Sequence, residues 1–260
     1  MTADSPAGAP VQISDLDGVF VISINRPHVR NAVNAEVADL IAAALDELDA
    51  SSHLAVGVLT GVGGTFCAGM DLKAFLAGER VFVPGRGFTG IVERSAEKPV
   101  LAAVEGHAVA GGCEVALACD MIVASEEARF GLPEVRRGLV AAGGGLLRLP
   151  QRIPRAVAVE LALTGETIGA ARALEIGLIN RVVPVGQARE AAIEFARCIA
   201  ANAPLAVRAT KRILAESPDW PANEAFQRQR EIADPVRESL DAREGARAFA
   251  EKCQPVWQGR

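Results

Sequence analysis

The sequence predicts an α/β protein with a helical C-terminal region, and two patterns carry this prediction. Up to about residue 150, short apolar segments typical of strands alternate with segments of helical spacing. Such alternation is typical of α/β layering with a largely parallel sheet. From Pro154 onward the pattern is almost wholly helical. We therefore expect a disordered tail at 1–10, a core at 11–200 and an appended helical region at 201–260.

The first predicted elements are a hairpin and a helix. Val11–Asn25 holds two apolar segments joined by Asp17-Gly18, which is a strong two-residue turn. Asn34 stands where a helix N-cap is expected, because apolar residues then recur at helical spacing from Val37 to Leu48.

A strand predicted at Leu54–Thr60 runs into the glycine-rich segment G-V-G-G-T-F-C-A-G-M-D-L. Glycines after a strand suggest a dinucleotide-binding loop, but the third glycine of G-x-G-x-x-G would fall on Phe66. The lysine-serine pair of a Walker loop is also absent. Both phosphate-loop interpretations are therefore excluded.

The middle of the chain alternates loops with short elements. Residues 77–90 are typical of a mobile flap, and we expect a short helix after them that ends at Glu97. An apolar strand at Val100–Val104 precedes a helix expected from about Gly112 to Ala118, and the next strand is D-M-I-V-A. A short helix is expected to begin at Leu146.

The C-terminal part has one strand-like segment, Arg181–Val183, and no strand signal after residue 200. A helical tail that cannot close its own core often docks on a neighbouring subunit. We therefore expect the protein to form oligomers.

Composition narrows the functional class. The net charge of −5 disfavours nucleic-acid binding and binding to anionic membranes as main roles. The first ten residues lack the basic and apolar regions of a signal peptide, and no apolar run is long enough to span a membrane. The five scattered cysteines favour reduced thiols in a cytoplasmic protein, and no metal-ligand spacing is present.

Two glutamates and two glycine-rich turns carry the candidate chemistry. Glu114 follows Gly111-Gly112, and Glu134 follows a proline twenty residues later. Paired carboxylates can divide acid and base work when burial tunes each of them. Met70 and Gly111 lie at two separate turns, and two N–H groups aimed at one carbonyl oxygen make an oxyanion hole. From spacing alone, solvated glutamates and ordinary glycine turns remain the alternative.

Five motifs decide between these alternatives, and they occur in order from about Val11 to Arg260. They are N-R-P-x-x-R-N-A, G-x-G-x-x-F-C-A-G-M-D-L, A-V-E-G-x-A-x-A-G-G-C-E-x-A-L-A-C-D, F-G-L-P-E and G-G-x-L-R-L-P. Together they resemble the enoyl-CoA hydratase/isomerase (crotonase) family. The resemblance implies a crotonase-like spiral of ββα units, a C-terminal helical region that builds trimers or hexamers, and an acyl-CoA ligand without any other cofactor.

The resemblance also implies roles for individual residues. The N–H groups of Met70 and Gly111 would bind the thioester oxygen, Glu134 would give a proton to the α-carbon, and Glu114 would activate the water. The residues expected to contact the acyl-CoA are His28, Val29, Arg30, Ala68, Asp71, Leu72, Pro133, Leu139, Phe249 and Lys252. We expect the last two to reach a CoA site across a subunit boundary.

The expected activity is reversible hydration of a trans-2-enoyl-CoA. Hydratases of the best-known type have P-G-x-G-G-T after the second glutamate, whereas this chain has V-A-A-G-G-G-L at 140–146. Arg136 and Arg137, directly after Glu134-Val135, suggest a polar or charged acyl group. Carnitinyl-CoA dehydratase-like activity, Δ3,Δ2-enoyl-CoA isomerase-like activity and a non-catalytic acyl-CoA-binding role are the alternatives.

Overall fold

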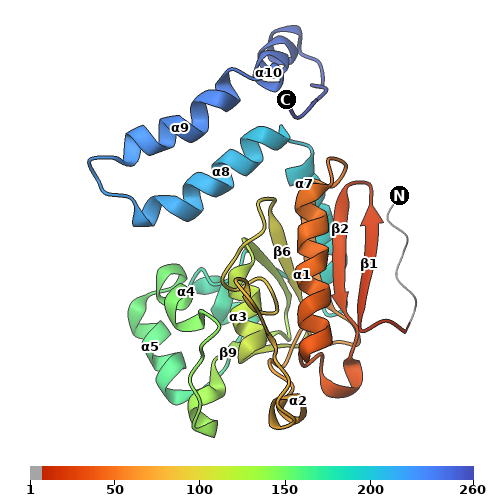
Figure 1. The fold of residues 1–260 in the computed structure, drawn as a ribbon, viewed down its shortest axis with the longest axis vertical. Helices are drawn as coiled ribbons and strands as arrows, with labels where there is room; N and C mark the ends of the chain where they lie inside the picture. The colour runs from red at the N-terminus through yellow and green to blue at the C-terminus, as the bar shows by residue number, and fades with distance from the viewer. Residues whose placement is uncertain (1–7) are drawn as a thin grey trace.

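A six-stranded sheet forms the centre of the protein, with strand order β1-β2-β3-β6-β8-β11 (Figure 1). The computed structural model describes residues 8–260, so most of the tail expected at 1–10 lies outside the described residues. β1 and β2 form an antiparallel hairpin, and every other neighbouring pair in this sheet is parallel. The expected α/β class is confirmed. The strands are β1 Val11–Leu16, β2 Val19–Ile24, β3 Val56–Gly61, β6 Val100–Val104, β8 Met121–Ser125 and β11 Arg181–Val183.

Both faces of this sheet are covered by helices. Phe20 and Ile22 of β2 point to one face, where they join the buried cluster of α1 (Ala35–Ala50). Val19 and Val21 point to the opposite face, where they join the cluster of α7 (Ala188–Ala200). Because side chains alternate along a strand, a strand covered on both faces is apolar throughout. This explains why β2 is buried at all six positions.

The local signals at the N-terminus fold as the sequence predicts. Asp17 and Gly18 both have positive φ angles, of 56° and 85°, as the tight turn between β1 and β2 requires. Asn34 caps α1, because its side-chain oxygen accepts a hydrogen bond of 3.2 Å from the N–H of Val37.

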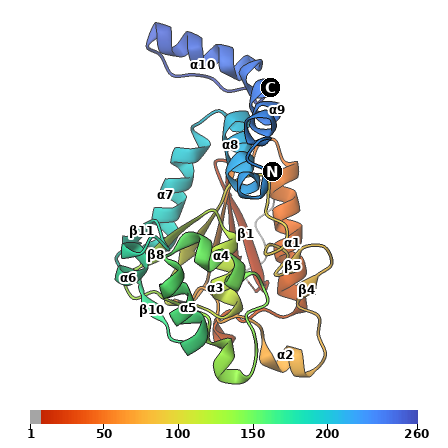
Figure 2. The same ribbon diagram turned by 90° about the vertical axis from the view of Figure 1, so that its left-hand side faces the viewer.

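Smaller elements connect the main sheet to the helices (Figure 2). A second sheet has the order β10-β9-β7, and a two-stranded hairpin joins β4 to β5 within the expected flap. The strands are β4 Phe82–Val83, β5 Gly87–Phe88, β7 His107–Val109, β9 Arg129–Gly131 and β10 Ile168–Gly169. The other elements before α7 are η1 Pro27–Val29, α2 Leu72–Leu76, α3 Gly111–Ala118, η2 Pro133–Arg137, α4 Gly145–Arg152, α5 Arg155–Thr164 and α6 Ala170–Glu175.

The short helix expected to end at Glu97 is absent, and residues 91–97 form turns and bends. The N–H groups of Glu97 and Lys98 donate instead to the carboxylate of Asp49 in α1, at 2.9 and 3.0 Å. The N–H of Glu93 donates to the carbonyl of Arg86. These long-range hydrogen bonds replace the local ones that a helix would need.

The C-terminal helices extend away from the sheet (Figure 1). They are α8 Pro204–Glu216, α9 Ala225–Arg237 and α10 Leu240–Glu251, with η3 Ser217–Asp219 between the first two. Neither α8 nor α9 contains a buried residue. The end of the chain folds back onto α10, because the buried Asp241 carboxylate accepts N–H groups from Gln258 and Gly259 at 2.7 and 2.9 Å. No helix among residues 8–260 is long and apolar enough to cross a membrane.

Candidate active site

Two tight turns lie against each other beside the main sheet, and we call residues 67–71 and 110–112 the glycine wall. Cys67 pairs with Ala108 through an isolated bridge, which holds the first turn beside the second. A side chain on Gly112 would place its Cβ 2.0 Å from the carbonyl oxygen of Cys67. A Cβ on Gly69, where φ is 92°, would lie 2.9 Å from the amide nitrogen of Gly111. Only glycine allows two backbones to approach this closely.

The glycine wall presents two backbone N–H groups. Met70 forms a parallel bridge with Val33, in which the Gly69 carbonyl and the Asp71 N–H make the hydrogen bonds at 2.8 Å each. The N–H of Met70 therefore points away from Val33. Gly111 is the first residue of α3, where N–H groups have no partner within the helix. Neither N–H donates to any described residue, so both are available to an acceptor.

Glu114 lies in the first turn of α3 and is only 4% exposed. Its Oε1 accepts a hydrogen bond of 2.9 Å from the N–H of Gly145, and the Gly143 backbone is a second donor. Burial raises the pKa of this carboxyl, while these hydrogen bonds and the charge of Arg148 oppose the rise. Glu114 is therefore a carboxylate held in one orientation.

Glu134 differs from Glu114 because its buried Oε2 has no hydrogen-bond partner among the described residues. It lies in η2, directly after Pro133. Burial raises its pKa to about 7, and the nearby Glu114 adds to the rise, while the charge of Arg137 opposes it. A carboxyl with this pKa is partly protonated at neutral pH and can both give and take a proton.

Both glutamates and the glycine wall line one cleft with a volume of about 390 Å³. The other side of the cleft is the segment 133–145, which we call the loop wall. The cleft brings together all four residues predicted to be catalytic and half of the predicted substrate contacts. The predicted residues that line it are Arg30, Ala68, Met70, Leu72, Gly111, Glu114, Pro133, Glu134 and Leu139.

Three predicted substrate contacts lie near the cleft but do not line it. Asp71 caps α2 by accepting the N–H groups of Lys73 and Ala74 and forms an ion pair of 3.0 Å with Arg26. Burial raises the pKa of Asp71, but these contacts outweigh it and leave the pKa below its ordinary value. His28 and Val29 lie in η1, directly before Arg30, which is its C-cap.

Phe249 and Lys252 are far from the cleft within one chain. Phe249 lies in α10 with 88% of its surface exposed, and Lys252 is the C-cap of the same helix. This helix and α2, which carries part of the cleft, lie at opposite ends of the molecule (Figure 1). One chain alone does not bring these two residues to the glutamates.

Several cleft residues were not predicted from the sequence. The aromatic residues Phe75, Phe82 and Phe88 bring an apolar surface from α2 and the β4-β5 hairpin, and the apolar residues of the flap were the available signal. The sequence indicated Arg137 as a charged residue beside Glu134 but did not place it in the cleft. The other unpredicted lining residues are Val109, Ala110, Val140, Ala142 and Gly143.

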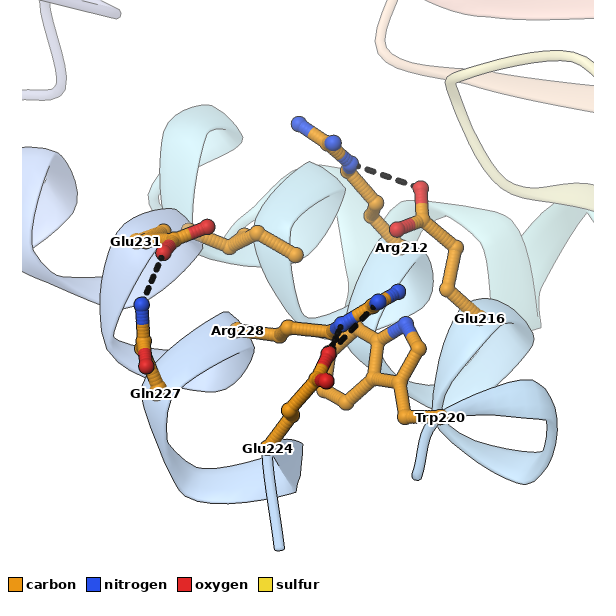
Figure 3. Close-up of a pocket in the computed structure, with 8 residues that line it drawn as sticks. Arg212, Glu216, Trp220, Glu224, Gln227, Arg228 and Glu231 are labelled. Carbon is orange, nitrogen blue, oxygen red and sulfur yellow. Dashed lines mark hydrogen bonds and ion pairs between the residues drawn. The ribbon is translucent and has the colours of Figure 1, made fainter. Parts of the chain in front are cut away.

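A second pocket lies between α8 and α9 and has a different character (Figure 3). Its charged side chains pair within their own helices, as Arg212 does with Glu216 and Arg228 with Glu224, at 2.7 and 2.8 Å. Exposed pairs of this kind contribute little to stability and leave no buried acid or base. Within residues 8–260, no cluster of three or more His, Cys, Asp or Glu side chains is arranged to hold a metal ion.

A parallel α/β core with two available N–H groups in one cleft with a buried and a half-buried glutamate defines a class of protein that handles carbonyl compounds through an oxyanion and proton transfer. Residues 15–260 match the sequence profile described as enoyl-CoA hydratase/isomerase. The chain belongs to this enoyl-CoA hydratase/isomerase family, as the motifs predict.

Individual relatives support this assignment. The chain is 44% identical over 250 residues to enoyl-CoA hydratase EchA19 of Mycobacterium tuberculosis, covering 93% of both chains. It is 41% identical over 251 residues to a carnitinyl-CoA dehydratase of Salmonella typhimurium, covering 93% of this chain and 95% of the relative. The crystal structure of enoyl-CoA hydratase EchA1 from Mycobacterium marinum superposes with a TM-score of 0.95 at 55% identity, covering 96% of this chain and 99% of that one. This superposition confirms the crotonase-like fold.

Proposed function

We propose that the protein is an enoyl-CoA hydratase that adds water reversibly to a trans-2-enoyl-CoA. The observation that carries this proposal is a pair of glutamates in one cleft, one buried and hydrogen-bonded and the other half-buried with an unpaired oxygen. Glu114 is fixed by backbone N–H groups, whereas Glu134 has an unpaired oxygen and a pKa of about 7. Addition of water across a double bond needs one group that accepts a proton from water and one that donates a proton to carbon.

The N–H groups of Met70 and Gly111 bind the thioester oxygen in this mechanism. When a nucleophile adds to the β-carbon, negative charge moves onto that oxygen as an enolate forms. Preorganised donors stabilise this charge, and the loss of one donor typically costs about a hundredfold or more in rate. Gly111 also begins α3, so the helix dipole favours the same charge.

The two glutamates then divide the proton transfers. The Glu114 carboxylate orients the water and removes its proton as the oxygen attacks the β-carbon. Protonated Glu134 donates to the α-carbon, and the reverse sequence removes water. Because the pair exchanges one proton with the substrate and water in each direction, the active enzyme holds one proton on the pair.

Dehydration of a carnitinyl-CoA is the second candidate. The identity with the Salmonella relative favours it, and the same donors and glutamates would serve, with only the acyl group changed. An isomerase needs proton transfer but no water, and a non-catalytic binding subunit needs neither glutamate.

We further propose the setting in which this activity operates. Residues 201–260 would assemble a homotrimer or homohexamer, because α8 and α9 have no buried residue within one chain. Assembly would bring Phe249 and Lys252 to a neighbour's acyl-CoA. Coenzyme A would enter as part of the substrate with no separate cofactor, in fatty-acid β-oxidation or related acyl-CoA metabolism in the cytoplasm.

The substitution Glu134→Gln tests the proposal. It keeps the shape of the side chain but removes the acid, so hydration of crotonyl-CoA should fall by at least about a hundredfold while acyl-CoA still binds. The loss of absorbance of the conjugated thioester measures turnover, and calorimetry with butyryl-CoA measures binding. Glu166→Gln, at an exposed glutamate paired with Arg136 outside the cleft, is the matched control. Wild-type turnover in the Glu134 variant would disprove the proposed role.

A further inference from the structure

Two arginines line the cleft, and they lie on different walls. Arg30 accompanies the glycine wall, because its carbonyl accepts the N–H of Ala68 at 3.1 Å. Arg137 lies in η2 on the loop wall, three residues after Glu134. Besides these two arginines, the charged residues that line the cleft are Glu114 and Glu134. The cleft therefore offers two cationic groups outside the pair needed for proton transfer.

Arg137 and its neighbour Arg136 are both exposed but differ in their partners. The Arg136 side chain donates to the Thr164 carbonyl at 2.9 Å and forms an ion pair with Glu166 on the far side of η2. The Arg137 guanidinium forms no hydrogen bond or ion pair with any residue among 8–260. It lies near enough to Glu134 to oppose the rise in the pKa of that carboxyl. The side chain of Arg136 is thus fixed by contacts within the protein, whereas the side chain of Arg137 has no such partner among the described residues and lines the cleft.

The position of Arg137 indicates which part of the substrate it would meet. In the proposed function the thioester oxygen lies at Met70 and Gly111, and the reacting carbons lie between the two glutamates. Leu139 and Val140 give the loop wall an apolar surface, and in the proposed binding mode the acyl chain beyond those carbons lies along it. Arg137 lies in the same wall, so a short acyl chain would end near its guanidinium. Arg30 lies on the opposite wall.

We propose that Arg137 is a specificity-determining residue that binds an anionic group at the end of the acyl chain, with a carboxylate as the simplest case. Guanidinium groups bind carboxylates through two parallel hydrogen bonds, a geometry that few other side chains provide. The same charge repels an acyl chain that ends in a quaternary ammonium group. The inference rests on the proposed function and refines its substrate class to trans-2-enoyl-CoA esters that carry a terminal carboxylate.

Paired substrates test this inference. The ratio of kcat/KM for trans-2-hexenedioyl-CoA to kcat/KM for trans-2-hexenoyl-CoA reports the preference for a terminal carboxylate at constant chain length. In Arg137→Met this ratio should fall about tenfold, the value expected when a charge-assisted hydrogen bond to the bound substrate is lost. Arg137→Lys should retain part of the preference. Arg172→Met, at an exposed arginine of α6 that pairs with Glu175 outside the cleft, is the control and should keep both the ratio and the activity of the wild type.

The CoA phosphates are the other anions available to Arg137, and the pantetheine thioesters of the two acyl groups separate the two cases. An acyl carboxylate site predicts the same fall in ratio with these phosphate-free substrates. If Arg137→Met lowers kcat/KM equally for both CoA esters and for neither pantetheine ester, the inference is overturned. An unchanged ratio of kcat/KM would overturn it as well. If the wild type hydrates neither ester, the proposed function fails, and calorimetry with adipoyl-CoA and hexanoyl-CoA then decides the Arg137 site. A preference for adipoyl-CoA that Arg137→Met removes supports the site, and equal affinities overturn it.

Discussion

The glycine wall and residues 138–140 of the loop wall are built in opposite ways. In the glycine wall, turns are pressed together so closely that a single added methyl group would meet backbone atoms. At residues 138–140 of the loop wall, Leu139 is 38% exposed and Val140 is 68% exposed, and an added Cβ on Gly138 would meet nothing within 4 Å, whereas Gly143 and Gly145 of the same wall pack against Glu114. The comparison suggests that the two regions have different roles. Backbone geometry that tolerates no side chain would serve the reaction, and exposed side chains that can change at little cost would serve substrate choice.

The largest effect is expected from a substitution that opens the glycine wall. In Gly112→Ala the new Cβ would lie 2.0 Å from the Cys67 carbonyl oxygen, so one of the two turns must move. Overpacking of this kind typically costs about 1–3 kcal/mol, and displacement of an oxyanion donor costs about a hundredfold in rate. Urea unfolding and crotonyl-CoA turnover measure the two effects.

Gly245→Ala is the matched control for this substitution. Gly245 lies inside α10, and its added Cβ would lie 3.4 Å from Trp257, an ordinary contact. Alanine is favoured over glycine within a helix by about 0.5–1 kcal/mol, so this variant should be as stable as the wild type or more so. A Gly112 variant that matched it in both measurements would show that the glycine wall is not tightly constrained.

The glycine wall was also the more predictable of the two walls. Its glycines stand at fixed positions within recognisable motifs, and Asn34, Asp17-Gly18 and the alternating apolar strands are local signals that fold as local rules require. The sequence-based prediction was wrong where contacts between segments far apart in the chain determine the structure. Asp49 takes the N–H groups that a helix ending at Glu97 would use.

The composition of the loop wall could not be derived in the same way. Neither the lack of a partner for Arg137 nor the approach of Phe82 and Phe88 to the cleft follows from spacing, because both depend on how the hairpin and η2 pack in three dimensions. The distance of Phe249 and Lys252 from the cleft likewise depends on where α10 points. The sequence therefore predicted which glutamates and turns meet in the cleft better than it predicted their surroundings.

A smaller effect is expected from a substitution of Arg148, whose side chain contacts the loop wall. Its guanidinium donates to the Val92 carbonyl and packs on Gly144, within the turn whose Gly145 N–H holds Glu114. Arg148→Met should release this turn and lower kcat about tenfold, the cost of one charge-assisted hydrogen bond, with little change in KM. Arg189→Met, at an exposed residue of α7, is the control.

The pH profile distinguishes this positioning role from a general loss of structure. The active pair holds one proton, so activity should fall above about pH 7, as Glu134 loses its proton, and fall again in acid, as Glu114 gains one. Arg148 holds the pKa of Glu114 down, so its removal raises that pKa and moves the acid limb to higher pH. A lower kcat with an unmoved acid limb would argue against the electrostatic part of this role.

The smallest effect is expected from Val140, an exposed residue of the loop wall that lines the cleft. Val140→Ala removes two methyl groups from the surface that an acyl chain would cover. Each buried methylene contributes about 0.8 kcal/mol, and partial exposure reduces this contribution, so kcat/KM for hexenoyl-CoA relative to crotonyl-CoA should fall about threefold. Stability should stay within about 0.5 kcal/mol of the wild type. Leu163→Ala, at a residue that is 73% exposed outside the cleft, should change neither quantity. If Val140→Ala instead slows crotonyl-CoA and hexenoyl-CoA equally, residues 138–140 contribute to the reaction itself, and the proposed difference between them and the glycine wall does not hold.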